Sequence, residues 1–180
     1  MTQSNLANRR RKLLLGLLAA AQLLFLGGYA LTHYAVHWYG KEIVLDTVPV
    51  DPRDLLYGDY VILSYEINTL DHSLWDSKGD LPERGDIIYV TIRKDAAGVY
   101  KASAASGHYP KQSDSHASVL KGRVEYSDDD SLHIRYGLEK YYVPEYTGKI
   151  LEQEAGNLRV KAKVGYRGTA VIEELAAKPS

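Results

Sequence analysis

The C-terminal part of the chain contains the stretch Leu158-Arg159-Val160-Lys161-Ala162-Lys163-Val164, in which apolar and basic side chains alternate without a break. Successive side chains of a β-strand point to opposite faces, so this period of two predicts a strand with one face in a core and the other in water. Four further runs show the same alternation, and we expect them to be strands as well. Their inward-facing residues would be Val61, Leu63, Tyr65 and Ile67; Ile88, Val90 and Ile92; Leu120, Val124 and Tyr126; and Leu132, Ile134 and Tyr136.

Two polar turns divide these runs where an antiparallel chain has to reverse. The acidic cluster Asp128-Asp129-Asp130 separates the last two runs and predicts a hairpin. A second turn, near Gly165 to Gly168, would join the strand at 158–164 to another at 169–175.

Helix-forming patterns are scarce in this region. Lys149 to Ala155 is a short amphipathic stretch that Gly156 can close as a C-cap, and Asp51 followed by Pro52 is typical of a one-turn helix start. We expect seven or eight strands. The sequence therefore predicts a mainly β fold, a β-rich sandwich or partly open barrel with one or two short helices.

A long uncharged segment precedes this region. From Leu13 to Gly40 there are 28 positions without a formally charged residue, which as a helix would measure about 42 Å. The hydrocarbon core of a bilayer needs only about 30 Å, so we expect a single transmembrane helix from Leu13 to about Leu31. The aromatic residues Tyr29, Tyr34, Trp38 and Tyr39 would then lie near the membrane interface. The chain divides accordingly into a basic N-terminus (1–12), an anchor with its interfacial segment (13–40) and a folded domain (41–180).

The charge distribution orients this anchor. Residues 1–12 carry four basic side chains and no acidic one, and the other 18 basic and 23 acidic residues give the rest of the chain a formal charge of −5. Positive charge stays on the cytoplasmic side of a membrane helix, so the folded domain is expected outside the cytoplasm. An acidic domain also speaks against nucleic-acid binding. A cleaved signal peptide is the alternative, but the apolar run is long and no clean small-residue cleavage site follows a short core.

The segment before the second strand run is the most informative one for function. It reads Pro49-Val50-Asp51-Pro52-Arg53-Asp54-Leu55-Leu56-Tyr57-Gly58-Asp59-Tyr60, and places a rigid turn, three carboxylates and Arg53 before a strand. Gly58 can adopt a positive φ, and Asp59 can accept backbone amide hydrogen bonds at the strand entry. The physical reading favours a turn that sets the strand register over a mouth lined with carboxylates.

Five residues of this region, Gly58, Asp59, Tyr60, Leu63 and Tyr65, spell G-D-Y-x-x-L-x-Y. The chain resembles the bacterial GDYXXLXY family, which is named for that string. A second stretch, Tyr136 to Glu145, is similar to that family's second motif, and the resemblance covers nearly the whole chain. The resemblance implies a single N-terminal membrane anchor; the family is a functionally uncharacterised group, and its genes often neighbour those of polytopic membrane proteins. Tyr57 is a departure, since similar sequences usually have arginine before the first motif.

The stretch Arg84-Gly85-Asp86 places a second Gly-Asp pair before a predicted strand, 27 residues after the pair Gly58-Asp59. Two such turns in a membrane-anchored β-domain are similar to type I signal peptidases, which raises a Ser–Lys peptidase as a question. The serine context of those enzymes is absent, and no lysine stands out as a desolvated base.

No metal or cofactor is expected. A chain without cysteine has no thiolate ligand, no cysteine nucleophile and no disulfide. His33 and His37 lie four residues apart, but no third ligand is in sight. His108, Asp114 and His116 are more simply explained as solvated loop residues, and Asp71-His72-Ser73 is too close in sequence for triad geometry.

Our first hypothesis is therefore a non-enzymatic binding module, which binds a polytopic membrane partner or a ligand of the cell envelope. The chain has 15 tyrosines against one phenylalanine, and tyrosine suits a binding surface because it combines a large ring with a polar tip. Because strand residues alternate, Tyr60 would face the partner and Tyr65 the core. The candidate binding residues are Arg53, Asp59, Tyr60, Tyr65, Glu139, Tyr141 and Tyr142.

Two alternatives stay open. An envelope hydrolase acting on a glycan would use paired carboxylates, such as Asp59 with Glu139 or Asp86, about 5–9 Å apart in a cleft. A purely structural subunit of a membrane complex would show an exposed apolar patch and no cleft.

Overall fold

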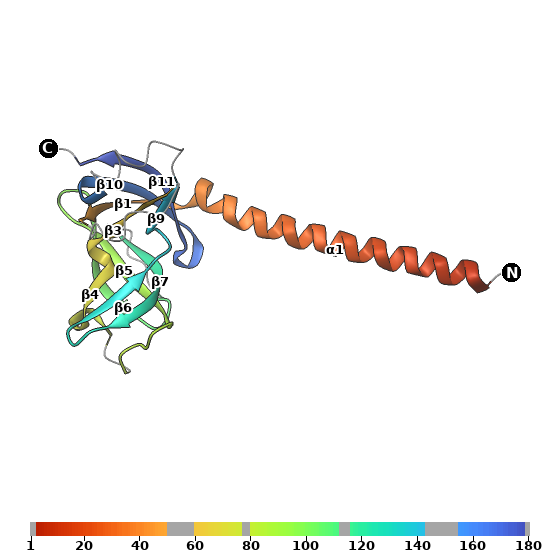
Figure 1. Ribbon diagram of the computed structural model, residues 1–180, viewed down its shortest axis with the longest axis horizontal. Coiled ribbons are helices and arrows are strands. Elements are labelled where there is room, and N and C mark those ends of the chain that lie inside the picture. The colour runs from red at the N-terminus through yellow and green to blue at the C-terminus, as the bar shows by residue number, and fades with distance from the viewer. Residues whose placement is uncertain (1–2, 50–59, 77–79, 112–115, 143–154, 179–180) are drawn as a thin grey trace.

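A computed structural model describes residues 3–49, 60–76, 80–111, 116–142 and 155–178 of the 180-residue chain. A β-rich body lies at one end, and one long helix projects from it (Figure 1). The helix is α1 (Gln3–Tyr39). The described strands are β1 (Lys41–Val48), β2 (Tyr60–Ile62), β3 (Ser64–Tyr65), β4 (Thr69–Asp71), β5 (Ile87–Lys94), β6 (Tyr100–Ser106), β7 (Ala117–Ser127), β8 (Ser131–Arg135), β9 (Lys140–Tyr142), β10 (Leu158–Val164) and β11 (Ala170–Ala177). Four single 3-10 turns accompany them: η2 (Glu66–Asn68), η3 (His72–Leu74), η4 (Ala155–Asn157) and η5 (Tyr166–Gly168).

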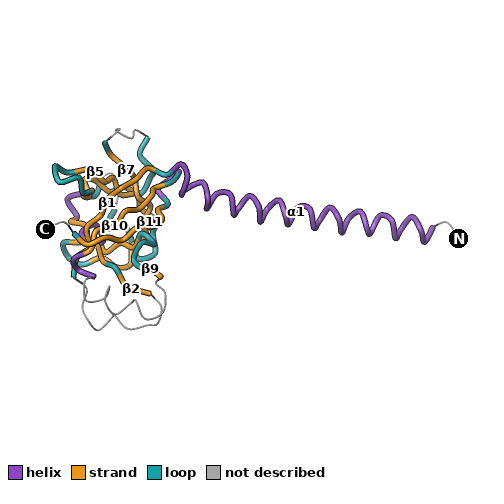
Figure 2. Tube along the Cα trace, turned by 90° about the horizontal axis from the view of Figure 1, so that it is seen from above, coloured by secondary structure: helices purple, strands orange, loops and turns teal. Residues whose placement is uncertain are grey.

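The strands form two larger sheets and a ribbon. One sheet has the order β11-β10-β1-β3, the other β4-β8-β7-β5-β6, and β2 pairs with β9. The pairings recorded between these strands are antiparallel. The chain passes from the first sheet to the second through β3, η2 and β4, and the sheets wrap around one interior as a nearly closed barrel (Figures 1 and 2). The predicted mainly β fold with few helices is confirmed.

One apolar cluster fills the space between the sheets. The predicted strand at 158–164 is β10, and its four inward residues are buried, as are Ile88, Val90 and Ile92 of β5. Burial of such side chains, worth about 1.5–3 kcal/mol each, is the main force holding the two sheets together. The hairpin at Asp128 to Asp130 and the turn between β10 and β11 lie where the sequence predicts them.

The run beginning at Tyr60 is not one strand. Its inward residues Val61, Leu63, Tyr65 and Ile67 are all buried, as expected. The hydrogen bonding, however, is divided: β2 pairs with β9 and β3 with β1. The run ends in η2, and β4, which follows it, pairs with β8. This division and the unpredicted strand β1 together contribute to a number of described strands above the expected seven or eight. The described chain also has four single 3-10 turns where one or two short helices were expected.

Tyr126 corrects another expectation. It was predicted to face the core with Leu120 and Val124, but its side chain is 49% exposed. The pairing of β7 with β8 shifts by one residue between Val124 and Tyr126. A β-bulge of this kind turns the following side chain to the other face, where Tyr126 stacks on His133 with ring centroids 4.1 Å apart.

β1 was not predicted, although Lys41–Val48 also alternates. Its inward residues are Ile43, Leu45 and Thr47, and Thr47 conceals the pattern because it is polar. The hydroxyl of Thr47 donates to the carbonyl of Leu158 and accepts from its N–H, both at 2.9 Å. This exchange lets a polar residue take an inward position without an unsatisfied group.

Helix α1 runs directly into the body. Its segment Arg10–Tyr39 is long and apolar enough to cross a membrane, and its large apolar side chains are exposed. Only Gly40 separates α1 from β1, and its N–H donates to the carbonyl of Val36 at 2.9 Å. The helix therefore reaches beyond the expected span of Leu13 to Leu31. The expected helical start at Asp51 and most of the stretch Lys149–Ala155 lie outside the described residues, whereas Gly156 lies within η4.

Candidate functional site

The two sequence motifs, some 80 residues apart in the chain, meet in the β2–β9 ribbon. Tyr60 pairs with Tyr142, Val61 with Tyr141, and Ile62 with Lys140. The N–H of Leu63 continues the pairing with a 2.9 Å hydrogen bond to the carbonyl of Glu139. The ribbon lies at one edge of the body, away from β5 and β7 (Figure 2). We call the described residues 60–68 and 136–142 the motif junction.

Two buried tyrosines lock this junction from inside. The hydroxyl of Tyr65 donates to the carbonyl of Leu138, and that of Tyr136 donates to the carbonyl of Ile67, both at 2.8 Å. Tyr65 is 2% and Tyr136 7% exposed. Each motif therefore supplies a side chain that ties down the backbone of the other.

The carboxylate of Glu139 is the third tie. Its Oε1 accepts from the N–H of Tyr136 at 2.6 Å and from Nδ2 of Asn68 at 3.0 Å, and its Oε2 accepts from the N–H of Gly137 at 2.8 Å. Gly137 has a φ of 83°, so the turn that Glu139 closes needs glycine at that position. Asn68 adds a bond from Nδ2 to the carbonyl of Ile134 and accepts from the N–H of Tyr65, both at 2.7 Å. Glu139 and Asn68 thus hold the junction together.

The electrostatics of this interior keep both tyrosines neutral. Burial raises the pKa of the Tyr65 phenol well above its usual value, and the negative charge of Glu139 raises it further. The same two causes, in the same order, raise the pKa of Tyr136. Both hydroxyls therefore remain hydrogen-bond donors throughout the ordinary pH range.

The outer face of the ribbon is aromatic and basic. The rings of Tyr60 and Tyr142 meet edge to face with centroids 5.9 Å apart, and Nζ of Lys140 lies 4.8 Å from the centre of the Tyr60 ring. The Tyr142 side chain is 74% exposed and that of Tyr60 is half-buried. Two aromatic rings and one cation held by a strand pair suit contact with a protein or a glycan more than chemistry on a substrate.

A comparison with protein-family models matches residues 22–175 to the model described as GDYXXLXY protein. The chain belongs to the GDYXXLXY family. The string that gives the family its name includes Tyr60, Leu63 and Tyr65, which lie in the junction described above. Neither the curated proteins nor the solved structures compared with the chain give a match.

The candidate residues occupy different positions with respect to this junction. Arg53 and Asp59, like Gly58, lie outside the described residues. Tyr65 faces the core, as the alternation predicts, and Tyr141 packs against the core from the inner side of the ribbon. Tyr60 and Tyr142 remain as the outward-facing candidates. Some of the candidate residues in the motif junction therefore stabilise the fold, as Tyr65 does, and others, such as Tyr142, are accessible.

Sequence reasoning did not name three contributors to the motif junction as site residues. Lys140 shares the outer face with Tyr142, which the period of two already implies for a strand through 140–142. Leu138 lies within the second motif but was not named as a site residue, because its part is the carbonyl that accepts from Tyr65. Asn68 carries no signal in a single sequence, because its importance comes from contacts with residues about 70 positions away.

The carboxylates that a hydrolase would pair are largely occupied. Glu139 is bound as described, and Asp86 Oδ2 accepts from the N–H of Glu83 at 2.9 Å, closing the turn in which Gly85 has a φ of 96°. Asp71 likewise accepts from the N–H of Ser73 at 2.8 Å, which makes it the cap of η3. Hydrogen bonding to Ser73 lowers the pKa of Asp71. The carboxylates of Glu139, Asp86 and Asp71 therefore act as acceptors for backbone N–H groups.

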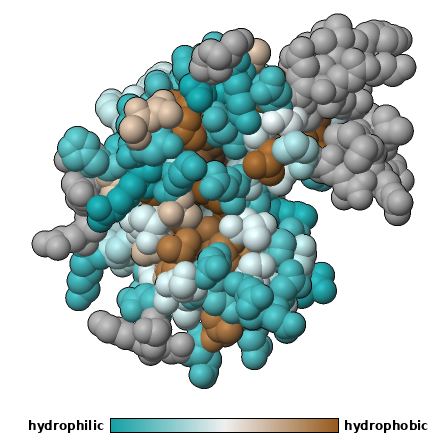
Figure 3. Space-filling model, turned by 90° about the vertical axis from the view of Figure 1, so that its left-hand side faces the viewer, coloured by the Kyte–Doolittle hydropathy of each residue, from teal (hydrophilic) through white to brown (hydrophobic). Residues whose placement is uncertain are grey.

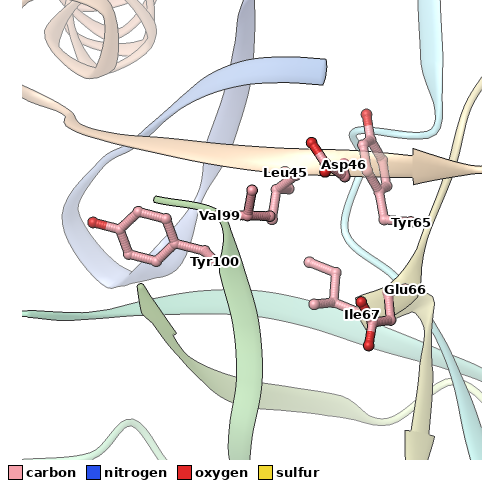
Figure 4. A pocket seen from close by; sticks show the side chains of 7 residues that line it. All are labelled: Leu45, Asp46, Tyr65, Glu66, Ile67, Val99 and Tyr100. Carbon is pink, nitrogen blue, oxygen red and sulfur yellow. The ribbon is translucent and has the colours of Figure 1, made fainter. Parts of the chain in front are cut away.

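A small cavity lies beside the junction, between β1, η2 and the start of β6 (Figure 4). It is lined by Leu45, Asp46, Tyr65, Glu66, Ile67, Val99 and Tyr100. Its volume of about 10 Å³ leaves room for roughly one water molecule. The hydroxyl of Tyr65 and the carboxylate of Asp46 already have partners, in Leu138 and Arg159. This cavity is a packing gap rather than a ligand site.

No group of three or more potential metal ligands comes together among the residues that the structure describes. Two of the residues considered as metal ligands from sequence can be placed as follows. His37 lies on the last turn of α1, and Asp114 lies outside the described part of the chain.

Proposed function

We propose that this protein is a membrane-anchored, extracytoplasmic interaction module, with α1 as an uncleaved single-pass anchor in the bacterial inner membrane. In this proposal the basic residues 1–12 remain in the cytoplasm, and the β-body lies on the periplasmic or extracellular side, where it binds a polytopic membrane protein. The alternative partner is a ligand of the cell envelope.

The outer face of the ribbon is the single observation that carries the proposal. The buried hydroxyls of Tyr65 and Tyr136 and the partly buried carboxylate of Glu139 join the two motifs. As a result, Tyr60 and Tyr142 are held in place on the outer face of the ribbon, beside Lys140. Tyrosine is enriched at protein interfaces because it combines a large contact area with a hydrogen-bonding tip. Lys140 adds a cation over the ring of Tyr60.

The hydrolase alternative has less support. It would need two carboxylates free to act on a glycan, and both Glu139 and Asp86 already accept backbone hydrogen bonds. The described surface at the end of the body opposite α1 is mostly hydrophilic, with small separate apolar patches (Figure 3). That end is therefore a poor candidate for the broad apolar interface of a purely structural subunit.

Co-purification from native membranes in mild detergent tests the interface. A stoichiometric multi-span partner should accompany the wild-type protein and be reduced by Tyr60→Ala and Tyr142→Ala. Tyr126→Ala is the matched control, because Tyr126 is also an exposed tyrosine stacked on a cross-strand neighbour. Equal loss in all three variants, or retention in all three, would exclude the ribbon as the interface.

Orientation is tested separately. The chain has no cysteine, so an exposed Ala176→Cys at the end of β11 can report the side of the membrane. A membrane-impermeant maleimide should label it in cells whose outer envelope has been opened but whose inner membrane is intact. Labelling only after lysis of the inner membrane would contradict the proposed topology.

A further inference from the structure

The turn between β10 and β11 packs against the C-terminal end of α1. A Cβ atom built on Gly165 would lie 2.6 Å from Cγ2 of Val36, and Val36 is 8% exposed. Nζ of Lys163 donates to the carbonyl of His37 at 2.8 Å. In Figure 1 this blue turn lies on the side of the body from which the helix emerges. The turn therefore occupies a defined place beside the last turns of α1.

The tip of this turn presents an aromatic ring and a cation together. Tyr166 is 86% exposed, and Cζ of Arg167 lies 5.5 Å from the centre of its ring. Neither side chain has a role in the core. Together they form an exposed pair with the character of residues found at a membrane interface.

The backbone of the tip is held in an unusual conformation. Arg167 has a φ of 64° and a ψ of 21°, a left-handed geometry that a non-glycine residue rarely adopts. Gly168 follows with a φ of 83°, and a Cβ there would lie 2.7 Å from the backbone N of Lys121 in β7. The N–H of Gly165 donates to the carbonyl of Thr169 at 2.7 Å. The contact with β7 and this hydrogen bond fix the direction in which the pair projects.

The end of α1 carries further aromatic side chains. Trp38 is 76% and Tyr39 is 87% exposed, and both immediately precede the single residue that links the helix to the body. Tryptophan and tyrosine favour the headgroup region of a bilayer, where the ring is partly dry and the polar tip is wet. Tyr166 extends this aromatic set from the helix onto the body.

We propose that the β10–β11 turn rests on the lipid headgroups of the membrane that α1 crosses, with Tyr166 at headgroup depth and Arg167 paired with a lipid phosphodiester. This inference rests on the membrane anchoring proposed above. The planar guanidinium matches phosphate oxygens in a bidentate geometry, which a lysine cannot reproduce. Helix and turn then give the body two points of contact with the bilayer, which fixes its tilt and so the direction in which the ribbon faces.

Spin labelling of the full-length chain tests the contact. Thr169→Cys places a label on an exposed residue beside the tip and leaves Tyr166 and Arg167 unchanged. Leu24→Cys reports the anchor, and Ala176→Cys at the far end of β11 reports bulk water. In vesicles of phosphatidylcholine and phosphatidylglycerol, the label at 169 should lose access to an aqueous nickel reagent relative to the label at 176.

Removing the contact should reverse this loss. In the Thr169→Cys background, Arg167→Glu should lower the ratio of lipid-contacting to water-exposed turns by about fivefold, the effect expected of one basic residue near an anionic surface. Arg167→Gly should act in the same direction, and since glycine accepts a positive φ, its effect cannot be ascribed to a misfolded turn.

The possible failures are distinguishable. If the label at 24 is in hydrocarbon while the label at 169 is as accessible as that at 176, the headgroup contact is overturned and the anchor stands. If the label at 24 is itself in water, the anchor fails and the headgroup contact falls with it. Shielding of residue 169 in native membranes but not in pure lipid vesicles would show that a protein covers the turn, which also overturns the inference.

Discussion

Tyr65 and Tyr136 are tied to each other's segments by a reciprocal exchange of hydrogen bonds. The hydroxyl of Tyr65 reaches the carbonyl of Leu138, two residues after Tyr136, and the hydroxyl of Tyr136 reaches the carbonyl of Ile67, two residues after Tyr65. Tyr65 belongs to the family's first motif, and in this structure its hydroxyl has an internal role. It holds the second motif in place, and the ribbon depends on both.

Removing either hydroxyl should destabilise the body. Tyr65→Phe and Tyr136→Phe each leave a buried carbonyl without its donor and should lower the free energy of unfolding by about 1–3 kcal/mol. The two losses should not add, because the residues share one network. Chemical denaturation of the detergent-solubilised protein measures this, with Tyr126→Phe as a surface control expected to change stability by less than about 0.5 kcal/mol. A neutral Tyr65→Phe would contradict the structural role assigned to the exchange.

Stability should also fall steeply at alkaline pH. Burial, and then the charge of Glu139, raise the pKa values of Tyr65 and Tyr136 above the usual 10.0. A raised folded-state pKa contributes stability that is complete below the unfolded value of 10.0 and is lost as pH rises beyond it. Unfolding measured from neutral pH to above this value should show the decline, and the double Phe variant should show a flatter one. Identical slopes would exclude these two phenols as the cause.

At acid pH the corresponding group is Asp46. The hydrogen bonds from Arg159, 2.8 Å from Nε to Oδ1 and 3.2 Å from Nη2 to Oδ2, lower its pKa below 3.8, against an opposing effect of burial. This stability is therefore present above 3.8 and is lost as pH falls through the lower folded-state pKa. Asp46→Asn should cost about 0.5–1 kcal/mol at neutral pH, since both side chains remain partly exposed, and should flatten the acid limb. Arg159→Gln should reproduce the same curve, because either change breaks the same pair.

The β10–β11 turn offers a pair of opposite changes. Gly168→Ala adds a Cβ against the backbone of Lys121 at a φ of 83° and should cost about 1–3 kcal/mol. Arg167→Gly relieves the left-handed strain at the preceding residue, and should be neutral or stabilising by up to about 1 kcal/mol. Thermal unfolding compares the two. Destabilisation by Arg167→Gly would mean that the arginine side chain makes a stabilising contact within the body.

The β-body should fold without its helix. The buried cluster between the sheets contains no α1 residue among those that the structure describes. Val36 of α1 is buried, but it lies outside this cluster. A fragment of residues 41–180 should therefore give a cooperative transition and a β-type circular dichroism spectrum. Because Lys163 then loses its bond to His37 and Gly165 its contact with Val36, the transition should fall slightly below that of the full chain. A fragment that is unfolded at room temperature would show that α1 is part of the folding unit.

How far the sequence predicts the structure depends on whether a feature is local. The period of two identifies the inward faces of β5 and β10 correctly because side-chain alternation follows from strand geometry alone. It fails at Tyr126, where an extra residue in β7 changes the register against β8. It also fails to show that the run from Tyr60 is divided between β9 and β1, since each of these partner strands is far away in the chain.

The amino-acid sequence by itself determines a β-rich body, a long apolar helix before it and membership of the GDYXXLXY family, because alternation, hydropathy and motif letters are readable from neighbouring residues. The tertiary structure alone decides what the motif residues do. It pairs Tyr60 with Tyr142, buries Tyr65 and engages the carboxylate of Glu139 with backbone amides. The physical reason is that hydrogen bonds across some 70 residues depend on how the sheets close around a common core, which no local pattern encodes.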